Sequence, residues 1–115
     1  MDLNHLHLHV SDVAVARRFY EDLFGFTERI WHGPILFLTN EDGFDLALAP
    51  DPSPQSFPAW FHFGFRLPSI DAVEKLHERA QALGVNITVP LERHEDLVFF
   101  CCKDAQSYRI EVYWE

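Results

Sequence analysis

The chain has 115 residues, a length that corresponds to one domain or to two very small modules sharing a core. Its formal net charge of −9, with acidic residues spread along the chain, disfavours nucleic acid as a partner, because phosphates are bound by lysine and arginine. No apolar run approaches the roughly 20 residues of a membrane span, and the N-terminus lacks a signal-peptide pattern. We therefore expect a cytoplasmic protein with no membrane partner.

The first predicted strand, residues 3–10, alternates strictly between histidine and apolar side chains. Successive side chains on a strand point to opposite faces, so three histidines share one face, namely His5, His7 and His9. The opposite face is apolar and requires a covering helix. Histidine is the commonest protein metal ligand. The imidazole face is therefore a candidate for binding a metal or ligand, although a histidine-rich edge strand would show the same pattern.

The next segment predicts a helix followed by three strands. The helix covers residues 13–24, with Ser11-Asp12 as its N-cap and Gly25 at its C-terminal end. The predicted strands cover residues 26–31, 35–38 and 44–49. The segment 40–43, Asn-Glu-Asp-Gly, is a hairpin signal between the last two.

Residues 50–58 contain four prolines and form a linker, because proline removes hydrogen-bond donors and fixes the backbone. After this linker the same order recurs: a strand at 60–67, a helix at 70–83, and strands near 86–92, 97–102 and 108–114. The predicted fold class is α+β. A single domain, residues 1–115, would contain two tandem βαβββ modules (about 1–49 and 59–115) that form curved mixed sheets with a concave metal or ligand pocket.

Aligning the two modules places His5 on His62 and Ala47 on Glu111. If each helix covers the apolar face of its sheet, the faces that carry His5, His62 and Glu111 remain open. Two imidazoles and one carboxylate are a ligand set for a divalent metal. The alternative is that His62 and Glu111 form a polar pair inside the sheet.

The two cysteines, Cys101 and Cys102, are adjacent on a predicted strand and so point to opposite faces. A disulfide between them is not expected, and adjacent cysteines are not a zinc-site spacing. The pattern indicates reduced cysteines in a cytoplasmic protein.

The chain resembles the vicinal oxygen chelate superfamily: glyoxalases, extradiol dioxygenases, fosfomycin-resistance thiol transferases and bleomycin-resistance proteins. The resemblance covers essentially the whole chain. It rests on Leu3-Asn4-His5-Leu6 and Val10-Ser11-Asp12 running into Phe19-Tyr20 and Leu23-Phe24-Gly25-Phe26, on His62, and on Asp104 with Tyr108-Arg109-Ile110-Glu111-Val112-Tyr113. It implies one divalent metal ion (Fe, Mn, Zn or Ni) bound by His5, His62 and Glu111.

Two departures bear on the reaction. The resemblance implies that glyoxalase I has a four-ligand site, with a second glutamate at the position of Ala47, so glyoxalase I activity is not expected. Asp45 shares a strand face with Ala47 and is the acid that could replace this glutamate. Fosfomycin-resistance transferases have a threonine where this chain has His7, and a basic residue beyond the last strand, where this chain stops at Glu115. Phosphonate binding would also require more positive charge than we expect in the pocket.

Extradiol dioxygenases also use two histidines and one glutamate, but they are typically larger and add an outer-shell His and Tyr. His7, His9 and Tyr108 match those two only by residue type, and we take His7 and Tyr108 as candidate catalytic residues. Arg66 and Arg109 are candidates for binding a carboxylate substrate; pairing with nearby acids is the alternative.

We therefore expect a metal-dependent enzyme of the glyoxalase and dioxygenase type, a lyase, transferase or dioxygenase other than glyoxalase I. Its small substrate would chelate the metal through oxygen atoms. The alternative is a metal-free protein that binds or sequesters a small molecule, as bleomycin-resistance proteins do. The resemblance also implies a homodimer, and the length of the 50–58 linker permits sites within one chain or shared between two chains.

Overall fold

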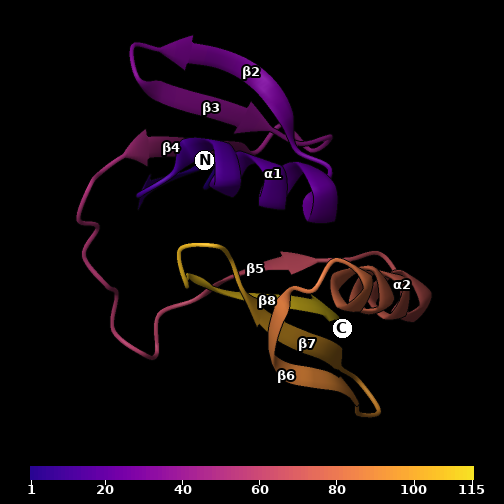
Figure 1. Cartoon of the computed structure of the whole chain (residues 1–115). Helices are drawn as coiled ribbons and strands as arrows, with labels where there is room; N and C mark the ends of the chain where they lie inside the picture. Colours follow the sequence, from indigo (N-terminus) through magenta and orange to yellow (C-terminus); the bar gives the residue numbers. More distant parts are fainter. The chain divides into compact units, whose positions relative to one another are not determined.

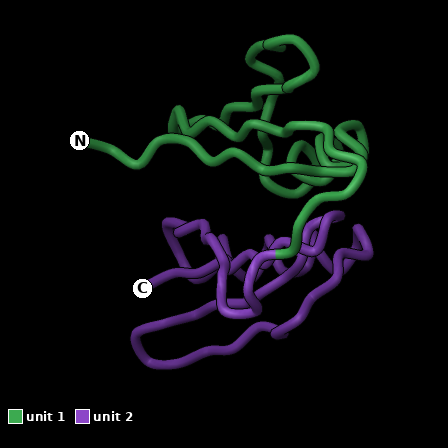
Figure 2. Tube along the Cα trace, turned by 90° about the vertical axis from the view of Figure 1, so that its left-hand side faces the viewer, with its two compact units in different colours: residues 1–56 green, residues 57–115 purple.

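The computed structural model describes all residues from 1 to 115 and divides the chain into two compact units, residues 1–56 and 57–115 (Figures 1 and 2). Each unit contains one helix and one four-stranded mixed sheet. This confirms the predicted α+β class and the tandem strand-helix-strand-strand-strand order. Neither helix has the length and apolar character needed to cross a membrane.

The first unit consists of β1 (His5–Val10), α1 (Val13–Phe24), β2 (Thr27–His32), β3 (Ile35–Thr39) and β4 (Asp45–Pro50). Its sheet has the strand order β1-β4-β3-β2, with β1 parallel to β4 and the other pairs antiparallel. The helix packs against β4. The alternation predicted for β1 is confirmed, because Leu8 and Val10 are buried while the three histidines are exposed.

Local signals at its ends set the limits of α1. The side chain of Asp12 accepts a hydrogen bond from the Val15 backbone N–H at 3.1 Å, which satisfies one of the donors left unpaired at a helix N-terminus. Gly25 ends the helix at a φ of 70°, a left-handed conformation that glycine adopts without steric cost. Between these ends, the buried stripe consists of Ala16, Tyr20 and Leu23.

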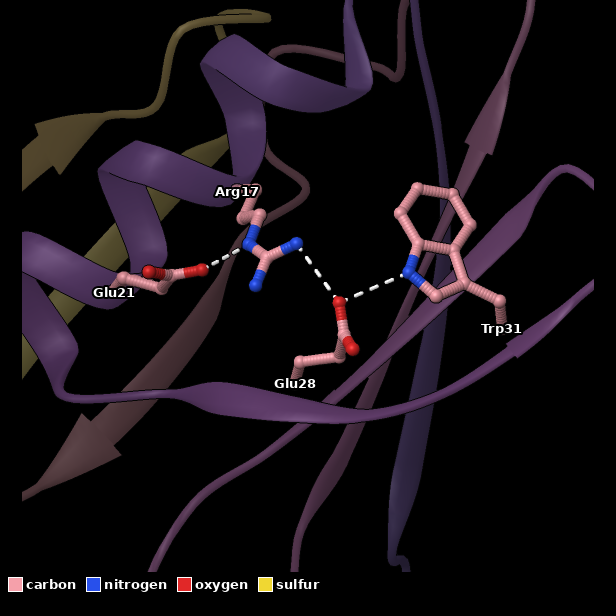
Figure 3. Close-up of polar contacts among 4 residues, drawn as sticks. All are labelled: Arg17, Glu21, Glu28 and Trp31. Carbon is pink, nitrogen blue, oxygen red and sulfur yellow. Dashed lines mark hydrogen bonds and ion pairs between the residues drawn. The ribbon is translucent and has the colours of Figure 1, made fainter.

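A polar network on the surface joins α1 to β2, whose side chains are all exposed (Figure 3). Arg17 binds Glu21 on its own helix and donates from Nη1 to Glu28 Oε1 at 2.9 Å. The indole Nε1 of Trp31 donates to the same Glu28 oxygen, also at 2.9 Å. Exposed ion pairs contribute at most about 1 kcal/mol each, so the network orients Trp31 more than it stabilises the unit.

The second unit repeats the first, with β5 (Phe63–Arg66), α2 (Ile70–Ala82), β6 (Asn86–Arg93), β7 (Val98–Lys103) and β8 (Arg109–Trp114). Its strand order, β5-β8-β7-β6, corresponds position by position to that of the first unit, and β5 is again parallel to β8. One face of this sheet packs against α2 through side chains that are almost fully buried: Val73, Ala80, Val98, Phe100, Cys102, Ile110 and Val112.

The strand predicted at 60–67 is shorter in the structure, where it begins at Phe63. The backbone N–H of Phe61 bonds to the carbonyl of Pro58 at 3.0 Å, so the chain is still turning there, and Trp60 is 76% exposed. The run of aromatic residues has strand character, but Pro58 starts a turn that delays the strand. As a result His62 lies immediately before β5 rather than inside it.

The loop between β7 and β8 is held by a buried carboxylate. Asp104 is only 6% exposed, and its Oδ1 accepts from the backbone N–H groups of Gln106, at 2.9 Å, and Tyr108, at 2.8 Å. Ser107, between these two, has a φ of 70°, which is unusual for a residue other than glycine. The carboxylate thus determines where β8 begins.

Candidate functional site

One face of the second sheet is free of the helix and carries polar side chains. Because Ile110 and Val112 point towards α2, the odd-numbered residues of β8 point the other way. We call this surface the polar face; on it lie His62, Gly64, Arg66, Cys101, Lys103, Arg109, Glu111 and Tyr113. The sequence prediction that His62 and Glu111 lie on the face opposite the helix therefore agrees with the register of β5, β7 and β8.

His62 and Glu111 come together on the polar face, where His62 Nε2 lies 3.4 Å from Glu111 Oε2. Their side chains are 54% and 30% exposed, so the pair is open to a ligand. On the other side of the ring, Nδ1 lies 3.2 Å from the carbonyl oxygen of Trp60, which can only accept a hydrogen bond. In the neutral ring, Nδ1 therefore donates to this carbonyl, and Nε2 has a lone pair that faces the carboxylate.

Two acceptors that face each other repel unless a proton or a cation lies between them. Two ligands at about 2.1 Å from one metal ion, at tetrahedral to octahedral angles, lie about 3.0 to 3.4 Å apart. The observed distance of 3.4 Å from Nε2 to Oε2 falls at the upper end of that range. The donor set, its spacing and the outer hydrogen bond on Nδ1 therefore fit a divalent metal, for which such outer partners orient the histidine. A proton on Nε2 gives the alternative, a simple ion pair.

The neighbours of Glu111 across the sheet are a glycine and a cysteine. Gly64 is its partner on β5, where a Cβ atom would stand 3.0 Å from the Glu111 carbonyl oxygen, so glycine permits this close approach. Cys101 is its partner on β7. Burial, together with the carboxylates of Glu111 and Glu92, raises the pKa of the Cys101 thiol, so it stays protonated at neutral pH. Cys101 was not among the residues predicted for the site, because its place beside Glu111 depends on the register between β7 and β8.

His5 lies on β1 in the first unit and has the same ring arrangement as His62. Its Nδ1 lies 2.8 Å from Asn4 Oδ1, so the amide oxygen accepts from Nδ1, and in the neutral ring Nε2 has a lone pair. The His5 ring is exposed. The sequence analysis used Asn4 only as part of the family resemblance, because an Asn-His pair has no spacing signal of its own.

Neither Asp45 nor Ala47 supplies a fourth metal ligand. Asp45 is the direct partner of His5 on β4, but its carboxylate binds Arg29 Nη2 at 3.1 Å. Ala47 is 4% exposed and has no ligating atom. The first unit therefore offers no unpaired carboxylate of β4 beside His5.

The two candidate catalytic residues lie in different surroundings. His7 is exposed on the same face of β1 as His5, and its ring centroid is 5.2 Å from that of His9. Tyr108 is 6% exposed and packs 5.3 Å from the ring of Phe57, which favours a structural role. His9 continues the row of histidines and bonds Asp51 at 3.0 Å, which holds the pKa of the Asp51 carboxyl below its usual value.

Within either unit, no three His, Cys, Asp or Glu side chains gather into a metal-binding group. The structure brings together two of the three predicted ligands, His62 and Glu111, and places the third, His5, in the other unit.

The chain matches the family model of the Glyoxalase/Bleomycin resistance protein/Dioxygenase superfamily over residues 2–112. Among curated proteins it is 30% identical to the uncharacterized protein PA2024 of Pseudomonas aeruginosa over 110 residues, which covers 86% of this chain and 77% of the relative.

Among solved structures, a possible glyoxalase from Bacillus cereus is 33% identical, with a TM-score of 0.82 and 97% of each chain covered. The fosfomycin resistance protein FosX from Listeria monocytogenes has the same fold at 21% identity, with a TM-score of 0.86 and coverage of 100% of this chain and 93% of that one. A lactoylglutathione lyase from Agrobacterium tumefaciens shares the fold at 18% identity, with a TM-score of 0.76 and coverage of 98% and 92%. The match to the family model spans nearly the whole chain, and the protein belongs to the Glyoxalase/Bleomycin resistance protein/Dioxygenase superfamily.

Proposed function

We propose that this protein is a divalent-metal-dependent enzyme that acts on a small, oxygen-chelating substrate in the cytoplasm. The observation that carries the proposal is the 3.4 Å approach of His62 Nε2 to Glu111 Oε2, an imidazole nitrogen and a carboxylate oxygen on an open face. A second observation supports it: the Asn4 side chain lies against Nδ1 of His5 as the Trp60 carbonyl lies against Nδ1 of His62, so Nε2 is the free nitrogen of both rings. One metal ion, Fe, Mn, Zn or Ni, would be held by His5, His62 and Glu111.

When bound, the ion supplies Lewis-acid chemistry to a substrate that chelates it through oxygen. The chain's own residues would hold the metal ion and orient its ligands. Trp60 and Asn4 fix the two imidazole rings, which lowers the cost of ordering them on binding. His7 shares a face of β1 with His5 and is the candidate general acid or base. This arrangement suits a lyase, a transferase or a dioxygenase.

The proposal excludes glyoxalase I, because Ala47 has no ligating atom and Asp45 is paired with Arg29. We expect the purified protein, incubated in turn with nickel, zinc and manganese, to leave the hemithioacetal of methylglyoxal and glutathione unchanged. The assay follows formation of the thioester product, with a lactoylglutathione lyase as the positive control. Isomerisation at a rate comparable with that control would overturn this part of the proposal.

We further propose that the protein is a homodimer whose sites are shared between chains. Neither unit alone gathers three ligands, so the first unit of one chain can complete the pair on the second unit of its partner. A His5→Ala chain and a Glu111→Ala chain are each expected to bind no metal. After unfolding and refolding together, shared sites would restore one of the two sites in each mixed dimer, measured as bound metal per dimer.

Mixed dimers that stay metal-free after confirmed chain exchange would show that the sites lie within single chains. A protein that sediments as a monomer at micromolar concentration would remove the dimer altogether.

The second candidate function is metal-free binding of a small molecule. It is favoured by the same His62–Glu111 pair if the imidazole is protonated, since the two groups then neutralise each other as an ion pair. Metal analysis of untagged, freshly purified protein separates the candidates. Stoichiometric metal supports the enzyme, and protein that neither contains nor takes up a divalent ion supports the binding protein.

A further inference from the structure

Beside the His62–Glu111 pair, the polar face carries two cationic side chains directly opposite each other. Lys103 on β7 and Arg109 on β8 are paired residues of the antiparallel ladder. Both share a strand face with members of the candidate site, Lys103 with Cys101 and Arg109 with Glu111, two residues away. His62 precedes Phe63, the partner of Ile110, and is therefore level with Arg109.

Neither cation has a carboxylate partner within its unit. The ion pairs of the second unit join Lys75 to Asp71, Arg93 to Glu74, and two histidines to Glu92 and Glu111. Arg66, the other arginine of the polar face, donates from Nη2 to the Glu115 backbone oxygen at 2.7 Å. Arg66 and Arg109 were equal candidates for binding a substrate carboxylate, but they differ in the structure. Arg66 has a hydrogen-bond acceptor on the protein, while Arg109 has none.

This arrangement is unfavourable unless an anion is present. Like charges directly opposite each other on neighbouring strands destabilise a sheet. The chain has 18 acidic residues against 9 lysines and arginines, so carboxylates are abundant, yet none lies against these two cations. On this face, Glu111 lies against His62 and Glu92 pairs with His94 instead.

We propose that Lys103 and Arg109 bind an oxyanionic group of the substrate, a carboxylate, phosphonate or phosphate. The guanidinium forms paired hydrogen bonds to two oxygens of such a group, and the ammonium adds a point charge. Residues two apart on a strand are separated by roughly 6.6 Å. The anionic group and the oxygens that face the His62–Glu111 pair are therefore only a few bonds apart, so the substrate is a small organic oxyanion. The part of this inference that concerns chelating oxygens rests on the proposed function.

The test uses methylphosphonate as the probe, titrated by calorimetry at low ionic strength into metal-free and manganese-loaded protein. The Lys103→Gln/Arg109→Gln double variant is expected to bind it at least about tenfold more weakly than the natural protein in both states. The matched control, Arg18→Gln/Lys75→Gln, removes the same charge from exposed positions on the two helices and is expected to bind within about twofold of the natural protein. Thermal unfolding confirms that both double variants are folded.

The outcomes separate this inference from the proposed function. Loss of methylphosphonate binding in the Lys103/Arg109 variant alone supports the anion site, even if no metal binds and the proposed function fails. Equal binding by both double variants, or no binding of methylphosphonate, acetate or phosphate by the natural protein in either state, overturns the anion site, even if manganese binds as proposed. Acetate and inorganic phosphate as further probes distinguish a carboxylate site from a phosphoryl site, and neutral dimethyl methylphosphonate is expected not to bind.

Discussion

Replacing Glu111 with Gln is expected to weaken divalent-metal binding by at least about 100-fold, the most that is typically lost when only an outer partner of a ligand is removed. The substitution keeps the shape of the side chain but removes its charge and one strong donor oxygen. The new amide N–H₂ can donate to His62 Nε2, which lies 3.4 Å from the Glu111 carboxylate, so the pair survives as a neutral hydrogen bond. Calorimetric titration with Mn²⁺ or Zn²⁺ measures the loss, and thermal unfolding of the metal-free protein is expected to be almost unchanged.

The same unit offers a matched control. Glu92 pairs with His94 at 3.2 Å on the surface, so Glu92→Gln breaks another histidine–glutamate pair and removes the same charge. This control is expected to bind metal within about twofold of the natural protein, because Glu92 pairs with His94 and not with a proposed ligand. Equal affinities for the Glu111→Gln and natural proteins would contradict the assignment of Glu111 as a ligand.

Replacing Asp104 with Ala is expected to lower the free energy of unfolding by about 3 kcal/mol. The substitution leaves the backbone N–H groups of Gln106 and Tyr108 without their acceptor, in a loop where the carboxylate is 6% exposed, and each such loss costs about 1–3 kcal/mol. Ser107, held at a φ of 70° between them, loses its support. For a protein of this size the change corresponds to a fall in melting temperature of about 10 °C.

The comparison for this prediction is Asp42→Ala, in the hairpin between β3 and β4, where the aspartate side chain is exposed. That variant is expected to unfold within about 0.5 kcal/mol of the natural protein. Denaturant unfolding of the two variants gives both values. An Asp104→Ala protein as stable as Asp42→Ala would show that the buried carboxylate does not hold the start of β8.

The order of elements could be predicted because its signals are local. The alternation of β1 is a period of two over six residues, and the caps of α1 depend on Asp12 and Gly25, which lie next to the helix that they limit. The start of β5 was predicted too early because the aromatic residues after Pro58 have strand propensity, whereas the turn depends on a backbone bond from Phe61 to Pro58.

The site could be predicted only as far as strand faces determine it. Alternation and the internal repeat put His62 and Glu111 on one face, and the 3.4 Å contact agrees with this. Alternation does not tell which atoms hold a side chain. Three hydrogen bonds depend on side-chain placement, which a periodic pattern does not predict. They join Asn4 to His5, the Trp60 carbonyl to His62, and Arg66 to the Glu115 backbone.

The prediction that His5 joins His62 and Glu111 is of a different kind, because it combines residues from the two units. The sequence pattern predicts which residues share a face within each unit. It does not predict whether the His5 that joins His62 and Glu111 comes from the same chain or from a partner chain. The assignment of His5 therefore rests on the internal repeat and on one shared feature: in both His5 and His62, Nδ1 lies against a protein oxygen.

X-ray absorption spectroscopy of the zinc-loaded protein tests this ligand set most directly, because imidazole ligands give a distinct scattering signature and can be counted. We expect two imidazoles and at least one carboxylate oxygen on the metal in the natural protein. We also expect His5→Ala and His62→Ala each to abolish zinc binding, while His94→Ala, which replaces an exposed histidine of the second unit, changes nothing. A zinc spectrum that keeps both imidazoles after replacement of His5 or His62, or that shows none in the natural protein, would contradict this ligand set.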